Sequence, residues 1–425
     1  MDAMERRALV EEVRLASSCS HPIRLQGQMV DLETGELTTR KLRVACKDRR
    51  VVVCRACSSL YKADAWILIA AGMFGGKGIE ESVAEHPKLF VTLTAPSFGA
   101  VHTIRSDGSC HAGRGAGRCA HGTSMNCGGR HQFDDEVLGS PLCAECFDYR
   151  GAVLWNAHAS RLFSETIRLL KRRLARFAGM SRDQFTAAAR INYLKVAEVQ
   201  RRGLIHFHAV LRADGPEHAA SEPPEWLSAA SLAQQLEVVI PSIAIRSVEG
   251  AEMSWGRQFD LSILDSEEAD RVRVGSYLAK YSVKTTDGSM HFARRFVHRR
   301  QILHLPTDEH RRALALTAWD LAADPRLEEL HLRLHAQAFG FTGQLITKSR
   351  GFTCTFGELR GARAAFMARS NSHLALPETF TYQGRGYDHP RAVELAEVFF
   401  RMDAELRSER AEARRAASEG PGGLI

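Results

Sequence analysis

The chain has no apolar run long enough to cross a membrane. Its longest run, Ala65 to Phe74, covers about half of the ~20 residues that a membrane-spanning helix needs, and Gly72 interrupts it. The first residues interleave acidic and basic side chains and lack the apolar segment of a secretion signal. We therefore expect a cytoplasmic protein with no membrane partner.

The composition excludes a wholly disordered or fibrous chain. Of the 425 residues, 44% are hydrophobic, which is enough for two or three units with buried cores. The formal net charge is only +7. This moderate basic excess is compatible with nucleic-acid binding but does not require it.

Cysteine is nearly absent from the later part of the chain, because nine of the ten cysteines precede residue 147 and only Cys354 follows. In a reducing cytoplasm, closely spaced cysteines bind metal more often than they form disulfides. The pairs Cys54/Cys57 and Cys143/Cys146 have the two-residue gap typical of zinc ligands. We expect about two structural Zn²⁺ ions.

The ligand sets are only partly defined by spacing. Cys46 joins Cys54 and Cys57 in the first set, with Cys19 or His21 as the fourth ligand. The second set contains Cys143 and Cys146, and our prediction adds Cys119 and Cys127. Other possible partners are Cys110, His121 and His131.

A predicted hairpin carries a candidate metal site. Two strands, residues 191–200 and 204–211, flank a short loop that ends in Gly203. Such a loop places Glu198 opposite His206, and His208 shares a face with His206 because side chains alternate along a strand. The two imidazoles and the carboxylate can then meet one cation. Two histidines on a strand are also often ordinary half-buried residues.

A predicted helix from Asp265 to about Lys284 carries two tyrosines. Tyr277 and Tyr281 lie four residues apart on one face, and each precedes a lysine, Lys280 or Lys284, by three residues. A nearby ammonium group favours the phenolate and can neutralise phosphate oxygens. A simpler explanation is an amphipathic helix that packs its tyrosines in a core.

The order of three motifs resembles that of the HUH endonuclease superfamily, specifically the rolling-circle replication initiators of actinobacterial plasmids and integrative elements. The motifs are the strand Phe90–Thr94, the Ile205-His-Phe-His-Ala-Val segment and the Tyr277–Lys284 segment. Similarity extends to flanking phrases such as Thr94–Gly99, Gly151–His158 and Lys348–Phe352. It spans most of residues 19–365.

The resemblance implies an α+β fold, with a central antiparallel sheet flanked by helices. We expect an N-terminal zinc-binding unit at residues 1–80 and an endonuclease domain at residues 86–300 with a Cys/His-rich insertion at 105–146. A helical C-terminal region with a disordered tail would occupy residues 301–425.

It also implies an enzyme that nicks one strand of origin DNA through a covalent 5′-phosphotyrosine and leaves a 3′-OH for polymerase. His206 and His208 would bind Mg²⁺ or Mn²⁺, with Glu198 as the candidate third ligand, although imidazole alone favours transition metals such as zinc. We expect Tyr281 to make the first cut and Tyr277 to make or assist the second transfer, aided by Lys280 and Lys284. Host helicase and polymerase are the implied partners.

A basic segment follows the tyrosine helix and mixes aromatic residues with arginines. It suits contacts to unpaired bases and phosphates, although an ordinary basic surface is an equally good explanation. The candidate DNA-binding residues are Arg294, Arg295, Arg299 and Arg300.

Other functions fit parts of the same pattern. A two-tyrosine transposase or a relaxase would use the same motifs. A zinc-containing DNA-binding regulator would need no catalytic tyrosine. A mononuclear iron oxygenase could use two histidines and a carboxylate, but such sites usually take their second histidine from a distant strand.

Overall fold

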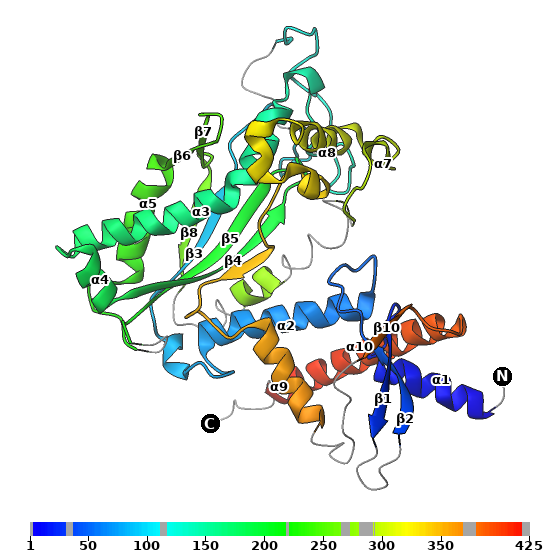
Figure 1. Ribbon diagram of the computed structural model, residues 1–425. Helices are drawn as coiled ribbons and strands as arrows, with labels where there is room; N and C mark the ends of the chain where they lie inside the picture. Colours follow the sequence, from blue (N-terminus) through cyan, green and yellow to red (C-terminus); the bar gives the residue numbers. More distant parts are fainter. Residues whose placement is uncertain are drawn as a thin grey trace. The chain divides into compact units, whose positions relative to one another are not determined.

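The computed structural model describes residues 3–30, 37–110, 117–217, 221–264, 273–279, 292, 294–368 and 380–418. The chain divides into two compact units. Unit 1 contains residues 1–64 and 356–425, and unit 2 contains residues 65–355. Helix α2 (Arg55–Phe74) contributes residues to both units (Figure 1).

Unit 1 contains a three-stranded antiparallel sheet in the order β10-β1-β2. The strands are β1 (Ile23–Val30), β2 (Leu37–Val44) and β10 (Thr381–Arg385). The helices of this unit, besides the first part of α2, are α1 (Ala3–Leu15), α9 (Phe356–Ala368) and α10 (Arg391–Ser418). Leu9 and Val13 of α1 form a small buried cluster with Ala392 and Ala396 of α10.

This division differs from the three consecutive parts expected from the sequence. Residues from both ends of the chain form one unit, because β10 pairs with β1 and Ile23 lies opposite Arg385. Asp64 of α2 is fully buried and accepts hydrogen bonds from Arg360 and Arg363 of α9. Contacts of such long sequence separation leave no local signal in the sequence.

Unit 2 is centred on a five-stranded sheet in the order β8-β3-β5-β4-β9, and every pairing in it is antiparallel. The strands are β3 (Lys88–Thr94), β4 (Arg190–Val199), β5 (Ile205–Asp214), β8 (Phe259–Ile263) and β9 (Ile346–Lys348). The predicted antiparallel sheet with flanking helices is therefore present. Strand β5 lies at its centre, between β3 and β4.

The two faces of β5 differ in character because its side chains alternate. One face joins the main hydrophobic core, which includes residues of α3 (Tyr149–Phe177) and α5 (Ala229–Ser242); Figure 1 shows α3 running along this part of the sheet. The residues of β5 in this core are Ile205, Phe207, Ala209, Leu211 and Ala213. The other face carries His206, His208, Val210, Arg212 and Asp214.

A smaller apolar cluster separates the polar groups at the two ends of this second face. Val210 packs there with Leu194 and Val196 of β4, and with Ile69 and Met73 of α2. Leu278 and Ala279 of the helical segment 273–279 and the fully buried Phe352 complete the cluster. The histidines thus lie on one side of this cluster along β5, and the Arg212–Asp214 pair lies on the other.

Two helices that cover the sheet begin at capping residues. Helix α3 begins at Tyr149, where the Asp148 side chain accepts a hydrogen bond from the Gly151 amide. Gly179 follows its end with a φ of 66°, as a glycine after a helix terminus often does. Helix α5 begins at Ala229, where the Ser228 side chain accepts a hydrogen bond from the Ser231 amide.

The remaining elements of unit 2 are short. They are α4 (Arg182–Ala188), β6 (Ala244–Arg246), β7 (Glu252–Ser254), α7 (Arg299–Leu303), α8 (Glu309–Leu321) and the 3-10 helices Glu81–Ala84, Ala144–Cys146, Pro325–Leu330 and Leu332–Ala338. Within the described residues, no helix is both long and apolar enough to span a bilayer.

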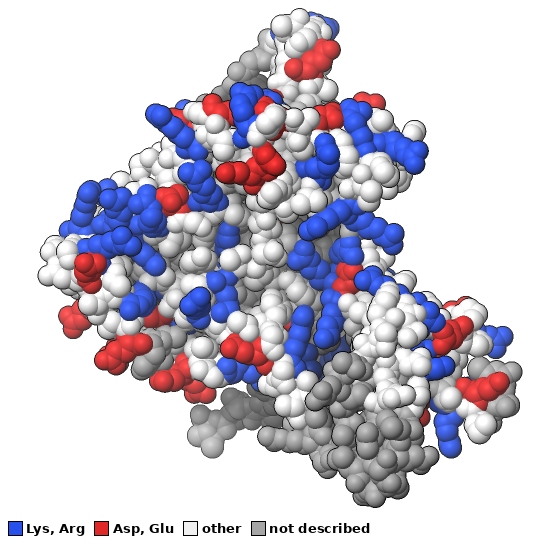
Figure 2. All heavy atoms as spheres, in the orientation of Figure 1, with Lys and Arg blue, Asp and Glu red and all other residues white. Residues whose placement is uncertain are grey.

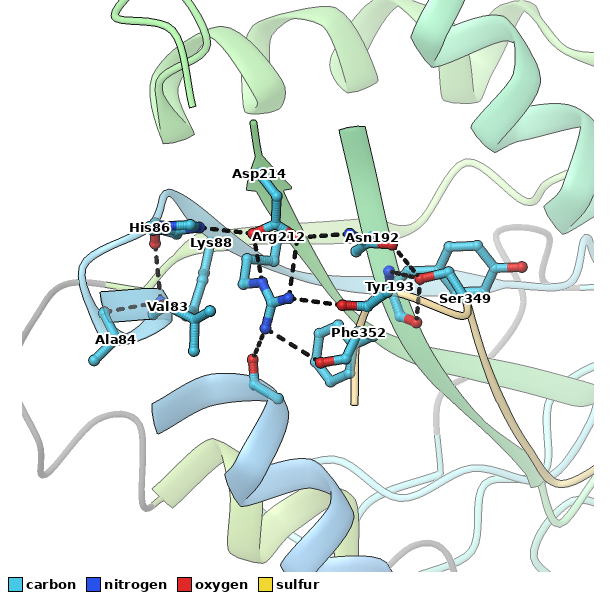
Figure 3. Close-up of polar contacts among 12 residues, drawn as sticks. Val83, Ala84, His86, Lys88, Asn192, Tyr193, Arg212, Asp214, Ser349 and Phe352 are labelled. Atoms are coloured by element: carbon cyan, nitrogen blue, oxygen red, sulfur yellow. Dashed lines mark hydrogen bonds and ion pairs between the residues drawn. The ribbon is translucent and has the colours of Figure 1, made fainter. Parts of the chain in front are cut away.

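A buried network of charged groups closes the end of the sheet opposite the histidines (Figure 3). Arg212 and Asp214 are both 0% exposed and form an ion pair, with Arg212 Nε 2.7 Å from Asp214 Oδ1. The guanidinium also donates to the carbonyls of Gly72, Gly351 and Phe352. Strand β5 is thereby tied to α2 and to the segment after β9.

Asp214 is shared with two more side chains of this network. Asn192 Nδ2 donates to its Oδ2 at 2.6 Å, and His86 Nδ1 lies 2.7 Å from its Oδ1. Buried charges are tolerated only when paired and hydrogen-bonded, and each of these contacts offsets part of the desolvation cost.

Candidate functional site

The β4–β5 hairpin has the predicted register. The Gln200 amide donates to the Leu204 carbonyl at 2.8 Å, and Gly203 takes a φ of 75°, which favours glycine. Glu198 lies opposite His206 in the strand pairing. The short loop fixes this register locally, which is why the sequence alone was sufficient to predict it.

His206 and His208 point to the same face of β5, and their ring centroids are 4.5 Å apart. Each histidine contacts a threonine of β3. His206 Nδ1 lies 3.1 Å from Thr94 Oγ1, and His208 Nδ1 lies 3.3 Å from Thr92 Oγ1. When Nδ1 carries the proton and donates it to the threonine, the Nε2 lone pair is available for a metal.

Glu198 points diagonally across the strand pair to the second histidine. Its Oε2 lies 3.3 Å from His208 Nε2, although the residue directly opposite in register is His206. Adjacent ligands of an octahedral ion with bonds of about 2.0–2.1 Å lie roughly 3 Å apart, so this nitrogen and oxygen are suitably spaced for one cation.

Burial keeps His206 neutral. The pKa of His206 is lowered to about 4, mainly by burial and to a smaller extent by the neighbouring His208. An imidazole must be unprotonated to bind a metal ion, so His206 can act as a ligand throughout the neutral pH range.

Tyr277 lies against this histidine pair. Its ring meets the His208 ring edge-on, with centroids 5.1 Å apart, and also contacts Phe90 of β3 at 5.9 Å. The residue is 37% exposed, so the phenol is accessible to solvent. The structure therefore brings Tyr277 of the third sequence motif to His208 of the second, and Phe90 of the first motif contacts both rings.

Other predicted residues are placed less fully. Lys280, Tyr281 and Lys284 lie outside the described residues. Arg294, Arg295, Arg299 and Arg300 are all exposed. Arg299 forms an ion pair with Asp320, with Nε 2.7 Å from Oδ1.

A groove of about 660 Å³ opens beside His206. Thr94 and Gln200, which both contact His206 Nδ1, line it, as do Arg202, Trp255 and Arg257. Arg257 is exposed and can meet a phosphate. Trp255 is buried in the core, and the Arg202 guanidinium donates to the carbonyls of Ala95 and Pro96, so these two side chains shape the groove wall.

A second basic surface of unit 2 follows the exposed side of α3 and continues onto α4. Figure 2 shows lysine and arginine side chains gathered over the region where Figure 1 places these helices. Its exposed arginines include Arg168, Arg172, Arg176 and Arg182. These side chains form a solvated basic face of the two helices.

Among the residues that the structure describes, twelve cysteine and histidine side chains form three compact groups rather than the two expected. In each group, the four possible ligand atoms all lie within 4.8 Å of one another. The groups are Cys19/Cys46/Cys54/Cys57, His102/Cys110/Cys127/His131 and Cys119/His121/Cys143/Cys146. These groups can each bind a structural metal such as zinc.

The spacing of ligand atoms matches tetrahedral zinc. Zn–S bonds of about 2.3 Å and Zn–N bonds of about 2.0–2.1 Å separate two sulfurs by roughly 3.8 Å, and a sulfur and a nitrogen by roughly 3.5 Å. The sulfurs of Cys46 and Cys57 lie 3.6 Å apart, and those of Cys19 and Cys54 lie 3.7 Å apart. Cys127 Sγ lies 3.5 Å from His131 Nε2.

The grouping corrects one predicted ligand set. Cys19, not His21, is the fourth member of the first group. Cys127, however, does not join Cys119, Cys143 and Cys146; His121 takes that place. The loop containing these residues folds back on itself, so proximity in sequence did not indicate which residues meet.

Comparison with known proteins gives the family. A family model described as "Replication initiator protein, pSAM2" matches residues 5–400. The chain belongs to this replication initiator family. A curated relative, the replication initiator protein of Streptomyces ambofaciens, is 34% identical over 424 residues, covering 91% of this chain and 88% of the relative. No solved structure matches the chain.

For this family member, sequence reasoning missed the residues that support the histidines. Thr92 and Thr94 alternate with apolar residues in β3, and the pairing with β5 places them opposite His208 and His206. The alternation of Phe-Val-Thr-Leu-Thr was a usable signal, because it puts both threonines on one face of the strand. Gln200, beside His206, carried no comparable signal.

Proposed function

We propose that the protein initiates replication of a plasmid or integrative element by nicking one strand of origin DNA. The nick forms a covalent 5′-phosphotyrosine and leaves a free 3′-OH. Support comes from family membership and, above all, from the contact of Tyr277 with His208 beside Glu198. A phenol, two imidazoles and a carboxylate on one partly exposed sheet face are the groups that such a reaction requires.

Glu198, His206 and His208 are the proposed ligands of a divalent cation. The donor set fits, since a carboxylate oxygen of Glu198 lies 3.3 Å from Nε2 of His208 and the lowered pKa of His206 leaves that imidazole unprotonated. Mg²⁺ or Mn²⁺ is the expected ion for nuclease chemistry, although two imidazoles also suit Zn²⁺. When bound, it supplies Lewis-acid polarisation of the scissile phosphate.

The chain's own groups carry the bond changes. A tyrosine Oη loses its proton and forms a bond to phosphorus, and the 3′-oxygen of the preceding nucleotide leaves with its electron pair and takes up a proton. Lys280 and Lys284 are proposed to favour the phenolate and to neutralise the phosphate. The phosphotyrosine ester keeps the energy of the broken bond for later strand closure.

Tyr281 is the proposed nucleophile for the first cut, and Tyr277 for the second transfer. The position of Tyr277 against His208 favours a direct role for it. A two-tyrosine transposase or a relaxase would use the same pair in alternating transfers. Transposition and conjugative-transfer assays separate those alternatives from origin nicking.

Single-stranded oligonucleotides that tile the element's origin test the proposal. With Mg²⁺ or Mn²⁺, a 3′-label should become linked to the protein while a 5′-label leaves on a fragment with a free 3′-OH. Tyr281→Phe should abolish the first adduct and Tyr277→Phe should impair the transfer to a second strand. Tyr382→Phe, an exposed tyrosine of unit 1, is the control and should behave as wild type.

An adduct that persists in the Tyr277→Phe/Tyr281→Phe double variant would show that neither residue is the nucleophile. DNA binding without any adduct in the wild type would favour a zinc-containing DNA-binding regulator. Origin DNA is the proposed substrate and partner, through the groove beside His206 and the arginines Arg294, Arg295, Arg299 and Arg300. Host helicase and polymerase would act after the nick.

A further inference from the structure

The group His102/Cys110/Cys127/His131 lies in the loop between β3 and α3, beside the turn of the β4–β5 hairpin. Its two sulfur–nitrogen distances are 3.5 Å for Cys127 and His131, and 3.9 Å for Cys110 and His102. The imidazoles of His102 and His131 meet edge-on, with centroids 5.3 Å apart. Four ligands of two kinds thus face one point from four separate places in the loop.

Asp135 orients one of these ligands. His131 Nδ1 lies 2.8 Å from Asp135 Oδ2, while the opposite ring nitrogen, Nε2, is the one near Cys127. A carboxylate that holds Nδ1–H leaves the Nε2 lone pair directed at the metal, which is the usual arrangement around histidine ligands of zinc. An incidental cluster of thiols and imidazoles would not need this third group.

The loop segment that contains Asp135 also contacts the hairpin turn, through Arg201. The guanidinium donates to the backbone carbonyls of Asp135, at 3.1 Å, and of Phe133, and it lies 5.1 Å from the centre of the Phe133 ring. Gly139 packs so closely on Arg201 that an added Cβ would lie 2.5 Å from its carbonyl carbon. The Gly139 amide in turn donates to the carbonyl of the ligand residue His102 at 2.8 Å.

Residues of this turn contact the first histidine of the pair. Gln200 Nε2 lies 3.3 Å from His206 Nδ1, and the Arg202 side chain donates to Gln200 Oε1 at 2.9 Å. Arg202 also donates to the carbonyls of Ala95 and Pro96 at the end of β3. A fixed turn therefore fixes the contacts around His206.

We propose that His102, Cys110, Cys127 and His131 bind a structural Zn²⁺ that braces the β4–β5 turn through Asp135 and Arg201. This is a third zinc site, separate from the group Cys119/His121/Cys143/Cys146 in the same loop. Arg201 and Asp135 are positioning residues: they act on the turn and do not contact the proposed substrate. The zinc site itself does not depend on the nicking proposal.

Metal analysis of the purified full chain tests the site. Wild type should contain three equivalents of zinc, and Cys110→Ser/Cys127→Ser should contain two. Cys119→Ser/Cys146→Ser, the matched control, should also contain two, with the loss at the other group. Three equivalents in Cys110→Ser/Cys127→Ser, or only two in wild type with no loss in this variant, would overturn the proposal.

Cobalt substitution identifies the ligands in folded protein. A site with two thiolates gives weaker sulfur-to-cobalt charge-transfer absorption than sites with three or four, so loss of the group at His102 should remove the smallest share of that band. A loss as large as that caused by Cys54→Ser/Cys57→Ser would contradict the assigned ligands.

Hydrogen exchange tests the brace without any DNA. In Cys110→Ser/Cys127→Ser, amides of residues 200–204 should exchange on the order of tenfold faster, because a constraint on the turn is lost. Cys119→Ser/Cys146→Ser should leave that segment unchanged. Arg201→Ala should retain three zinc equivalents yet show the same faster exchange, which covers the case in which the cysteine variant fails to fold. Unchanged exchange in Arg201→Ala would refute the bracing role.

Discussion

Tyr277 touches His208 edge-on, with ring centroids 5.1 Å apart at an interplanar angle of 88°. The two residues are about 70 positions apart in sequence, and the contact joins the helical segment 273–279 to the central strand of the sheet. Tyr277 is partly exposed, whereas His208 is buried.

Removal of the His208 imidazole should abolish cation-dependent nicking. His208→Ala removes the nitrogen next to Glu198 and the ring beneath Tyr277, so we expect the rate of adduct formation to fall by at least ~100-fold. Glu198→Gln should have a smaller effect in the same direction. Adduct formation at several Mn²⁺ concentrations measures both.

The control is His304→Ala, which removes an exposed imidazole of unit 2 and should leave the rate unchanged. DNA affinity, measured separately by fluorescence anisotropy, should be similar in all three variants. Equal nicking by His208→Ala and wild type would mean that the cation, if required, binds elsewhere.

Lys195 should make stability depend on pH. Its side chain is 4% exposed, and its Nζ lies 4.6 Å from the Phe163 ring centre and 4.1 Å from that of Phe207. Burial lowers the pKa of Lys195 to about 7. Between pH 7 and the ordinary lysine value near 10.5, the unfolded chain holds a proton that the folded chain lacks. Stability should therefore rise with pH in this window, by up to about 1.4 kcal/mol per unit.

Urea unfolding of wild type and Lys195→Met across this pH range measures the effect. The variant should lose the rise, and it should be the more stable protein at pH 7. Lys62→Met, an exposed lysine of α2, corrects for general charge effects. Parallel profiles for wild type and Lys195→Met would show that the buried amine remains charged.

Arg212 should be far more important for stability than an exposed arginine. Arg212→Met leaves Asp214 without its guanidinium partner and frees the carbonyls of Gly351 and Phe352 inside the protein. We expect the free energy of unfolding of unit 2 to fall by about 3–5 kcal/mol. Arg299→Met, which breaks the exposed pair with Asp320, should leave the urea midpoint unchanged. Similar midpoints for the two variants would contradict the role of the buried network.

The sequence predicted those features that depend on short-range geometry. The register of Glu198 and His206 follows from a short loop with one glycine, and strand alternation places His208 on the same face. The order of motifs indicated the antiparallel sheet through a resemblance, and the family match agrees with it. The contact between Tyr277 and His208 could only be expected by analogy, since nothing in the periodicity of either segment encodes it.

Other features depend on long-range contacts that leave no periodic pattern. The pairing of β1 with β10 joins residues from opposite ends of the chain, so residues 1–80 could not be separated correctly from the C-terminal region. Cys127 was assigned to the wrong neighbours because ligands within one folded loop are sorted by its path in space. The fully buried Arg212 resembled an ordinary charged residue at the end of a strand.

The pairing of β1 with β10 has a consequence for biosynthesis. During translation, residues 65–355 leave the ribosome as one continuous block, and unit 2 can condense as soon as that block has emerged. Unit 1 cannot complete its sheet at that stage, because Arg385, which lies opposite Ile23, is synthesised only near the end of the chain. Until then β1 exposes an unpaired edge, so the nascent protein is most vulnerable to aggregation at its oldest residues.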